Sequence, residues 1–220
     1  FSCLKNIVSE GRTIIANIER VSSLYLTKTV YSVILCVLFI LLAREYPFIP
    51  IQLSWMSAMA IGVPSFLLTL EQNESMDGGG FLRHVLRIAL PQALAMVVCL
   101  LTIQVLTPFW NDDPTMTYMF NLLVGGTVSF MVVIEVCRPM NWVRRTMTVI
   151  LIGIFALGII LFPGLLGIYS IFRWECVFAL PMICMVLVVS RAFRQLVILA
   201  YQLKDWAAVK IRGLIEKARV

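Results

Sequence analysis

Charged residues are scarce in this sequence, and their scarcity excludes most soluble folds. Only 14% of the 220 residues are Asp, Glu, Lys or Arg, and 60% are hydrophobic. A typical soluble domain has about 25% charged residues and about 45–50% apolar ones. Mean hydropathy is +0.93, and a soluble core of this size cannot bury so much apolar surface. The composition therefore predicts a chain embedded in a lipid bilayer. It excludes a disordered chain, a collagen-like repeat and a disulfide-rich secreted module.

The residue patterns of common catalytic and metal sites are also missing. There are six cysteines but no CxxC pair, and Cys36, Cys99 and Cys184 lie within apolar runs. These cysteines are interpreted as small packing residues rather than zinc ligands or a disulfide framework. The only histidine, His84, lies in a predicted loop without a Ser or Cys partner. A hydrolytic site is therefore not expected.

Six apolar segments are long enough to cross a bilayer, which requires about 17–25 residues in a helix. Their backbone groups must find partners within the segment, which favours helices over open strands. The predicted fold class is therefore all-α: a polytopic membrane protein with six transmembrane helices. The segments are Leu24–Ala43, Ile51–Leu70, Ile88–Leu106, Thr117–Cys137, a run from Thr146 to Phe172 whose residues from Pro163 onward are expected in an external loop, and Cys176–Ser190.

Basic residues gather on one side of the predicted membrane. Of the 18 Lys and Arg residues, 15 lie in four segments that alternate spans place on the same side: 1–22, 71–87, 138–145 and the residues after 190. This bias predicts that both termini are cytoplasmic. Because the basic residues lie in loops between apolar runs, the net charge of +6 is not interpreted as a nucleic-acid surface.

The charge pattern also divides the chain into three parts. Residues 1–22 are expected to form a cytoplasmic stalk helix that continues into the first span. Residues 23–194 form the six-span bundle. Residues 195–220 form a basic cytoplasmic tail whose apolar residues recur at helical spacing, which is typical of an interfacial amphipathic helix.

Two ionisable residues fall inside the predicted spans, where burial of a charge costs at least about 2.5–3.5 kcal/mol. Lys28 shares a helical face with Thr29 and Ser32, so this polar stripe is expected to face protein or water. Alternatively, Lys28 extends to the nearby interface. Glu135 ends the fourth span; it is interpreted as a cation ligand, as a partner of Lys28, or as a boundary carboxylate paired with Arg138.

The second span contains a predicted break. Ser57 precedes the run Gly62-Val63-Pro64 at the middle of the span, and Pro64 removes a backbone donor, which frees a carbonyl one turn earlier. Transporters bind ions at such broken helices, although a simple kink has the same sequence signature.

Four stretches resemble a known family. They are SEGRTIIANI at 9–18, PIQLSW at 50–55, GVP at 62–64 and VIEVCRPMN at 133–141. They resemble the C-terminal membrane half of P-type cation-transporting ATPases, closest to the calcium-pump branch and its bacterial relatives. The resemblance implies that the chain is helices five to ten of a pump and a fragment of it. The phosphorylation and nucleotide-binding domains, and with them Mg and ATP, would belong to the parent pump.

The resemblance also implies candidate cation ligands. The family's ligand positions fall on Thr29, Ser32, Ser57 and Glu135, whereas two further positions carry Ala60 and Ile61. Only one carboxylate remains, so a single cation site completed by the missing fourth helix is expected rather than two calcium sites.

Lys28 resembles the lysine of the gastric proton pump and is interpreted as a tethered cation. Gly62 and Pro64 are the expected helix break. The soft-metal motif CPC is missing from this span, so copper or zinc transport is not expected.

The expected partners are the lipid bilayer, a small inorganic cation such as calcium, and the missing N-terminal part of the same pump. The expected location is the plasma membrane of a bacterium. Two other classes stay open at this stage: a free-standing six-span secondary transporter or channel, and a structural membrane subunit. A helix that runs unbroken from residues 1–22 into the bilayer would favour the pump.

Overall fold

The computed structural model describes residues 2–70, 81–109, 113–168, 177 and 179–217. Within these ranges six helical segments are long and apolar enough to cross a membrane, which confirms the predicted all-α fold. In chain order the elements are α1 (Ser2–Leu41), α2 (Pro50–Ser57), the π-helix η1 (Ala58–Gly62), α3 (Val63–Thr69), α4 (Phe81–Leu106), the 3-10 turn η2 (Thr107–Phe109), α5 (Pro114–Val136), α6 (Trp142–Leu161) and α7 (Ala179–Lys217).

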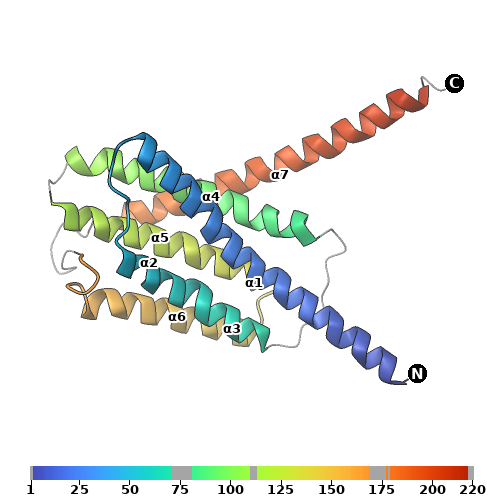
Figure 1. Cartoon of the computed structure of the whole chain (residues 1–220), viewed down its shortest axis with the longest axis horizontal. Helices are drawn as coiled ribbons and strands as arrows, with labels where there is room; N and C mark the ends of the chain where they lie inside the picture. The colour runs from blue at the N-terminus through green and yellow to red at the C-terminus, as the bar shows by residue number, and fades with distance from the viewer. Residues whose placement is uncertain (1, 71–80, 110–112, 169–176, 178, 218–220) are drawn as a thin grey trace.

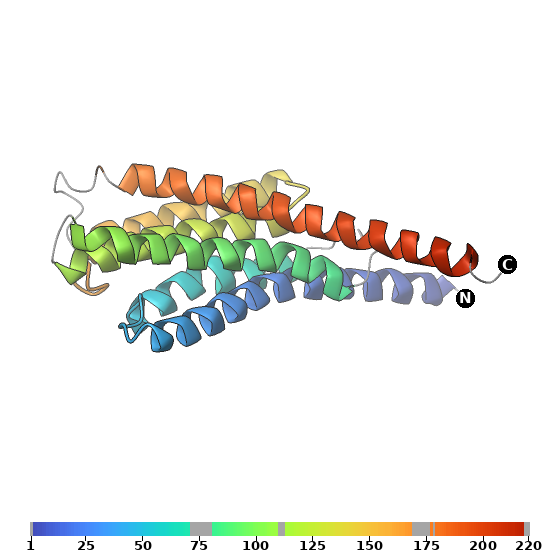
Figure 2. The ribbon, with the colours of Figure 1, turned by 90° about the horizontal axis from the view of Figure 1, so that it is seen from above.

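The helices form one elongated bundle with both termini at the same end (Figures 1 and 2). We call this end the terminal side and the opposite end the distal side. Helices α1 and α7 extend past the other helices on the terminal side (Figure 1), and α7 lies alongside α4 (Figure 2).

Helix α5 is the centre of the bundle. In its most apolar window 72% of residues are buried inside the molecule, against 17% for α7. Two adjacent glycines let neighbours approach it closely: an added Cβ at Gly125 would lie 2.9 Å from the Met56 sulfur, and one at Gly126 would lie 2.5 Å from the Phe155 ring. Side chains of α2 and α6 therefore pack directly against the α5 backbone.

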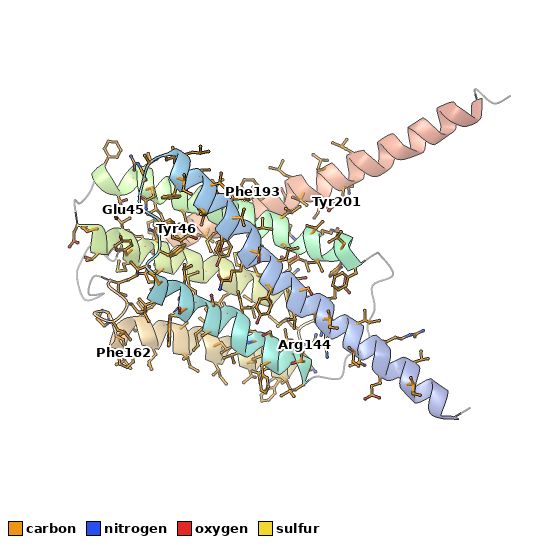
Figure 3. The ribbon with its side chains drawn as sticks, in the orientation of Figure 1. Glu45, Tyr46, Arg144, Phe162, Phe193 and Tyr201 are labelled. Atoms are coloured by element: carbon orange, nitrogen blue, oxygen red, sulfur yellow. The ribbon has the colours of Figure 1, made fainter. Side chains whose placement is uncertain are left out.

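Buried polar side chains donate hydrogen bonds to backbone carbonyl groups that lie outside the helices. On the distal side, Gln52 Nε2 donates to the Leu166 carbonyl at 2.9 Å, and Asn121 Nδ2 donates to the Pro47 carbonyl at 2.7 Å. On the terminal side, the buried Arg144 (Figure 3) donates from one guanidinium nitrogen to the Pro139 carbonyl at 2.9 Å. Each bond gives a partner to a backbone acceptor that the bilayer would leave unpaired.

Two helices extend beyond their predicted spans. Helix α4 begins at Phe81 rather than at Ile88, which places His84 in a helix instead of the expected loop. Helix α7 continues to Lys217; the predicted start of its span, Cys176, lies outside the described residues. The apolar runs underestimate both helices because helical backbone continues where charged side chains can already reach water.

Two glycines of α6 give a test of this packing. An added Cβ at Gly158 would overlap the Trp55 ring of α2, whereas one at Gly153 would have no atom within 4 Å. We expect Gly158→Ala to lower the free energy of unfolding by about 1–3 kcal/mol through overpacking. Gly153→Ala should be neutral or stabilising by about 0.5–1 kcal/mol, because it only removes backbone entropy. Thermal unfolding in detergent micelles measures both; equal effects would contradict the α2–α6 contact.

Candidate functional site

The second span changes its helical winding at the position where the sequence predicts a break. The backbone N–H of Val63 donates to the Ala58 carbonyl, five residues earlier, which is the π-helical pattern. Pro64 has no N–H, so the Ala60 carbonyl lacks its α-helical donor. The hydroxyl of Ser57, at the start of η1, donates to the Leu53 carbonyl at 2.6 Å. The result is a locally widened helix with a backbone acceptor at mid-span.

The inner face of this widened turn meets α1 and α5 at a small cavity. Ala60 and Ile61 are buried and line it together with Lys28, Tyr31 and Ser129. Its volume of about 10 Å³ is close to the minimum for one water molecule. Lys28 therefore lies against the break in the second span, and not against the carboxylate of Glu135.

Two of the predicted hydroxyl ligands, Thr29 and Ser32, lie on α1 but do not line this cavity. Thr29 is exposed and its hydroxyl donates to the Tyr25 carbonyl at 3.0 Å. Ser32 is half-buried and hydrogen bonds to the side chain of Tyr46, a loop residue (Figure 3) whose pKa is raised, mainly by burial. On the second span, Ala58 and Gly62 are also exposed. The neighbouring elements α1 and η1 therefore both present small or polar residues that the described part of the chain leaves uncovered.

Glu135 has a different partner from those considered in the sequence. Its carboxylate forms an ion pair with Arg194 of α7, and the two side chains are 15% and 38% exposed respectively. Sequence reasoning considered Arg138 and Lys28 instead. One feature of the sequence could have predicted the Glu135–Arg194 pair. The fourth and sixth predicted spans both end on the basic side of the membrane, so their last residues can lie close together. The pairing of Lys28 with Glu135 in an ion-free state stays a prediction.

Glu135 and Arg194 belong to the wall of a second, larger cavity on the terminal side. This cavity has a volume of about 400 Å³ and lies between α1, α4, α5 and α7. We call it the basic cavity; its charged or titratable lining residues among those described are Glu19, Arg20, His84, Arg87, Glu135, Arg138 and Arg194.

The described residues do not hold a complete cation site. They contain no group of three or more His, Cys, Asp or Glu side chains placed to bind a metal. Neither cavity is lined by two of the predicted ligands Thr29, Ser32, Ser57 and Glu135. These four residues, with Lys28, Gly62 and Pro64, therefore stay predictions. What the geometry adds is that Thr29 and Gly62 are exposed.

Comparison with known proteins finds curated relatives with one common description. A probable cation-transporting ATPase of Streptococcus pneumoniae is 34% identical over 173 residues, covering 74% of this chain and 22% of that protein. A calcium-transporting ATPase of Mycolicibacterium smegmatis is 34% identical over 161 residues, covering 66% and 20%. One of Mycobacterium bovis is 42% identical over 108 residues, covering 44% and 14%. No protein-family model matches the chain.

The chain is a homologue of the P-type cation-transporting ATPases. It spans about a fifth of the length of the first two relatives. With six candidate spans, the homology identifies an integral membrane protein and confirms the family resemblance seen in the four sequence stretches.

The Glu135–Arg194 pair predicts a measurable coupling between α5 and α7. We expect Glu135→Gln and Arg194→Gln each to destabilise the protein, because each leaves a half-buried charge without its partner. The double variant should cost less than the sum of the two, with a coupling energy of about 0.5–3 kcal/mol. Thermal unfolding of the four proteins in detergent gives the cycle; strictly additive effects would show that the two charges do not interact.

Proposed function

We propose that this chain is the ion-pathway membrane domain of an ATP-driven P-type pump that moves calcium or another small inorganic cation. The observation that carries the proposal is the broken turn of the second span, which lies beside Lys28 of α1. The helix widens there and Pro64 supplies no N–H, and Thr29 and Gly62 are each exposed. Hydroxyl and carbonyl groups are hard oxygen ligands, which calcium prefers.

The exposed surface of α1 and the second span, which includes Thr29 and Gly62, leaves room for further ligands. Calcium takes six to eight oxygen ligands, and the only carboxylate among the four predicted ligands is that of Glu135. We infer that the remaining ligands come from a helix of the same pump that packs on this surface. A bacterial plasma membrane fits the organisms of the relatives.

Helix α1 supplies the mechanical connection that such a pump requires. It runs from Ser2 to Leu41 as a single helix, so its terminal-side part is continuous with the part that carries Lys28 and Thr29. A displacement of the terminal side is therefore transmitted to the predicted ligands. In the complete pump, Mg and ATP would act in the phosphorylation and nucleotide-binding domains, and this domain would bind neither.

A free-standing six-span transporter or channel is the rival function. It would need no ATP and no long stalk. The unbroken α1 and the homology to ATPases favour the pump.

The cation dependence of ATP hydrolysis tests the proposal. In proteoliposomes of the full-length protein, hydrolysis should rise with buffered free Ca²⁺ or another divalent cation. Glu135→Gln should raise the half-activating concentration by at least about tenfold, because a charged ligand is lost. Arg194→Gln is the matched control, since it breaks the same ion pair but keeps the carboxylate.

Two results would contradict this assignment. Cation flux that proceeds without ATP would favour the rival transporter or channel. Equal shifts in Glu135→Gln and Arg194→Gln would mean that Glu135 acts only as the partner of Arg194.

Lys28 predicts a change in the charge moved per cycle. Lys28 lines the cavity at the broken turn, where its ammonium group would replace one bound cation electrostatically. In proteoliposomes, Lys28→Met should therefore increase the charge transferred per ATP, measured as the ratio of pump current to hydrolysis. An unchanged ratio would reject the role of tethered cation while leaving the pump assignment intact.

A further inference from the structure

The basic cavity has the wrong charge for a cation pathway. Its described lining contains four arginines and two glutamates, an excess of two positive charges, with His84 in addition. Glu135 is held by Arg194, and Arg87 and Arg138 line the same wall. A cleft lined by charge of one sign concentrates ions of the opposite sign. The expected occupant is therefore an anion.

The chemistry of the wall favours a phosphate group. Guanidinium groups are planar and present several fixed N–H donors, which match phosphate oxygens in pairs. Four helices contribute to the wall, with Arg20 from α1, Arg87 from α4 and Arg194 from α7. A volume of about 400 Å³ is within the range of small-molecule sites, which is about 300–1,000 Å³.

The depth of the cavity points to a lipid as the source of this phosphate. The candidate span of α4 begins at His84 and that of α5 ends at Val136, and both residues line the cavity. The cavity therefore lies at the membrane boundary on the terminal side, at the level of the phospholipid headgroups. Figure 1 shows α1 and α7 diverging here, with the start of α4 between them.

The walls are also accessible to lipid and partly apolar. Helix α7 is little covered by other helices, with only 17% of its span window buried. Ala16, Ile88 and Ile198 add apolar surface beside the arginines. When a lipid headgroup phosphate lies in the cavity, its acyl chains would contact these apolar side chains. A free phosphate has no acyl chains and would gain no such contact. Basic pockets between transmembrane helices on the cytoplasmic side bind anionic lipid headgroups in this manner.

We propose that the basic cavity between α1, α4, α5 and α7 is a binding site for the phosphate headgroup of an anionic phospholipid. Glu19 opposes this charge from within the cavity wall; its Oε1 atom is buried and has no hydrogen bond partner among the described residues. Three of the four predicted cation ligands, Thr29, Ser32 and Ser57, do not line the cavity. The fourth, Glu135, lines it and is paired with Arg194.

Native mass spectrometry of the full-length protein in detergent tests the site by counting retained lipid. Dioleoyl-phosphatidylglycerol should be retained, and dioleoyl-phosphatidylcholine should be retained at least about tenfold less because its choline cancels the anionic charge. The variant Arg87→Gln/Arg138→Gln should weaken phosphatidylglycerol retention by about tenfold through loss of two charge-assisted contacts. Both arginines are exposed, so the fold should tolerate their replacement.

Glu19→Gln and Arg145→Gln make the test directional. Glu19→Gln removes the opposing charge and should strengthen retention of phosphatidylglycerol. Arg145 is exposed at the start of α6 and does not line the cavity, so Arg145→Gln should retain the lipid as the unmodified protein does. Added salt should weaken retention in the unmodified protein, since screening reduces attraction between exposed charges.

Three results would overturn the proposal. Equal loss of lipid in Arg145→Gln and in Arg87→Gln/Arg138→Gln would show a general surface effect. Displacement of the lipid by inorganic phosphate at equal concentration would identify a soluble anion as the ligand. Binding of Ca²⁺ that Glu19→Gln abolishes and Arg87→Gln/Arg138→Gln strengthens would identify a cation vestibule. None of these results bears on whether the full-length protein hydrolyses ATP.

Discussion

Every backbone polar group in this protein must find a partner within the protein, because hydrocarbon offers none. Within a helix the backbone N–H and carbonyl groups pair with one another. Unpaired carbonyl groups therefore arise where a helix ends. There the structure uses long polar side chains from neighbouring helices: Gln52 for the Leu166 carbonyl, Asn121 for the Pro47 carbonyl and Arg144 for the Pro139 carbonyl. A different case is the turn before Pro64, where the Ala60 carbonyl lacks its α-helical donor because proline has no N–H. The proposed cation pathway depends on this turn, which is wound as a π-helix.

The span count and the all-α class were predictable from the sequence because lipid imposes length and apolarity on each segment separately. The break at Gly62–Pro64 was predictable for a similar reason, since proline lacks a donor in any context. The helix ends were less predictable. Arg83 and His84 have no apolar signal, yet the helix includes them, because a helix crossing the headgroup region keeps its backbone bonds while its side chains reach water. An apolar run therefore predicts which part of a helix lies in the hydrocarbon core, but it does not predict the residue at which the helix begins.

The candidate site was predictable only in part, because pairing between helices depends on how they are rotated. Lys28 and Glu135 lie at similar predicted depths, and charge alone favoured their contact. Instead, α1 turns Lys28 toward Ala60 and Ile61, and α7 brings Arg194 to Glu135. Likewise, Thr29 lies next to Lys28 in sequence but is exposed. Adjacent residues on a helix are about 100° apart, so the lysine can face the bundle while the threonine is exposed.

The two cavities differ in the charge of their lining residues and in their depth in the membrane. The small cavity at the broken turn is lined by Lys28 and by hydroxyl-bearing residues. It lies within the span, where an unbalanced charge is costly. The basic cavity lies at the boundary, where arginines remain partly hydrated and excess positive charge is tolerated. A cation approaching from the terminal side through the basic cavity would meet four arginines. Excess positive charge at the boundary favours an anion over a cation, which is the basis for proposing an anionic headgroup in the basic cavity.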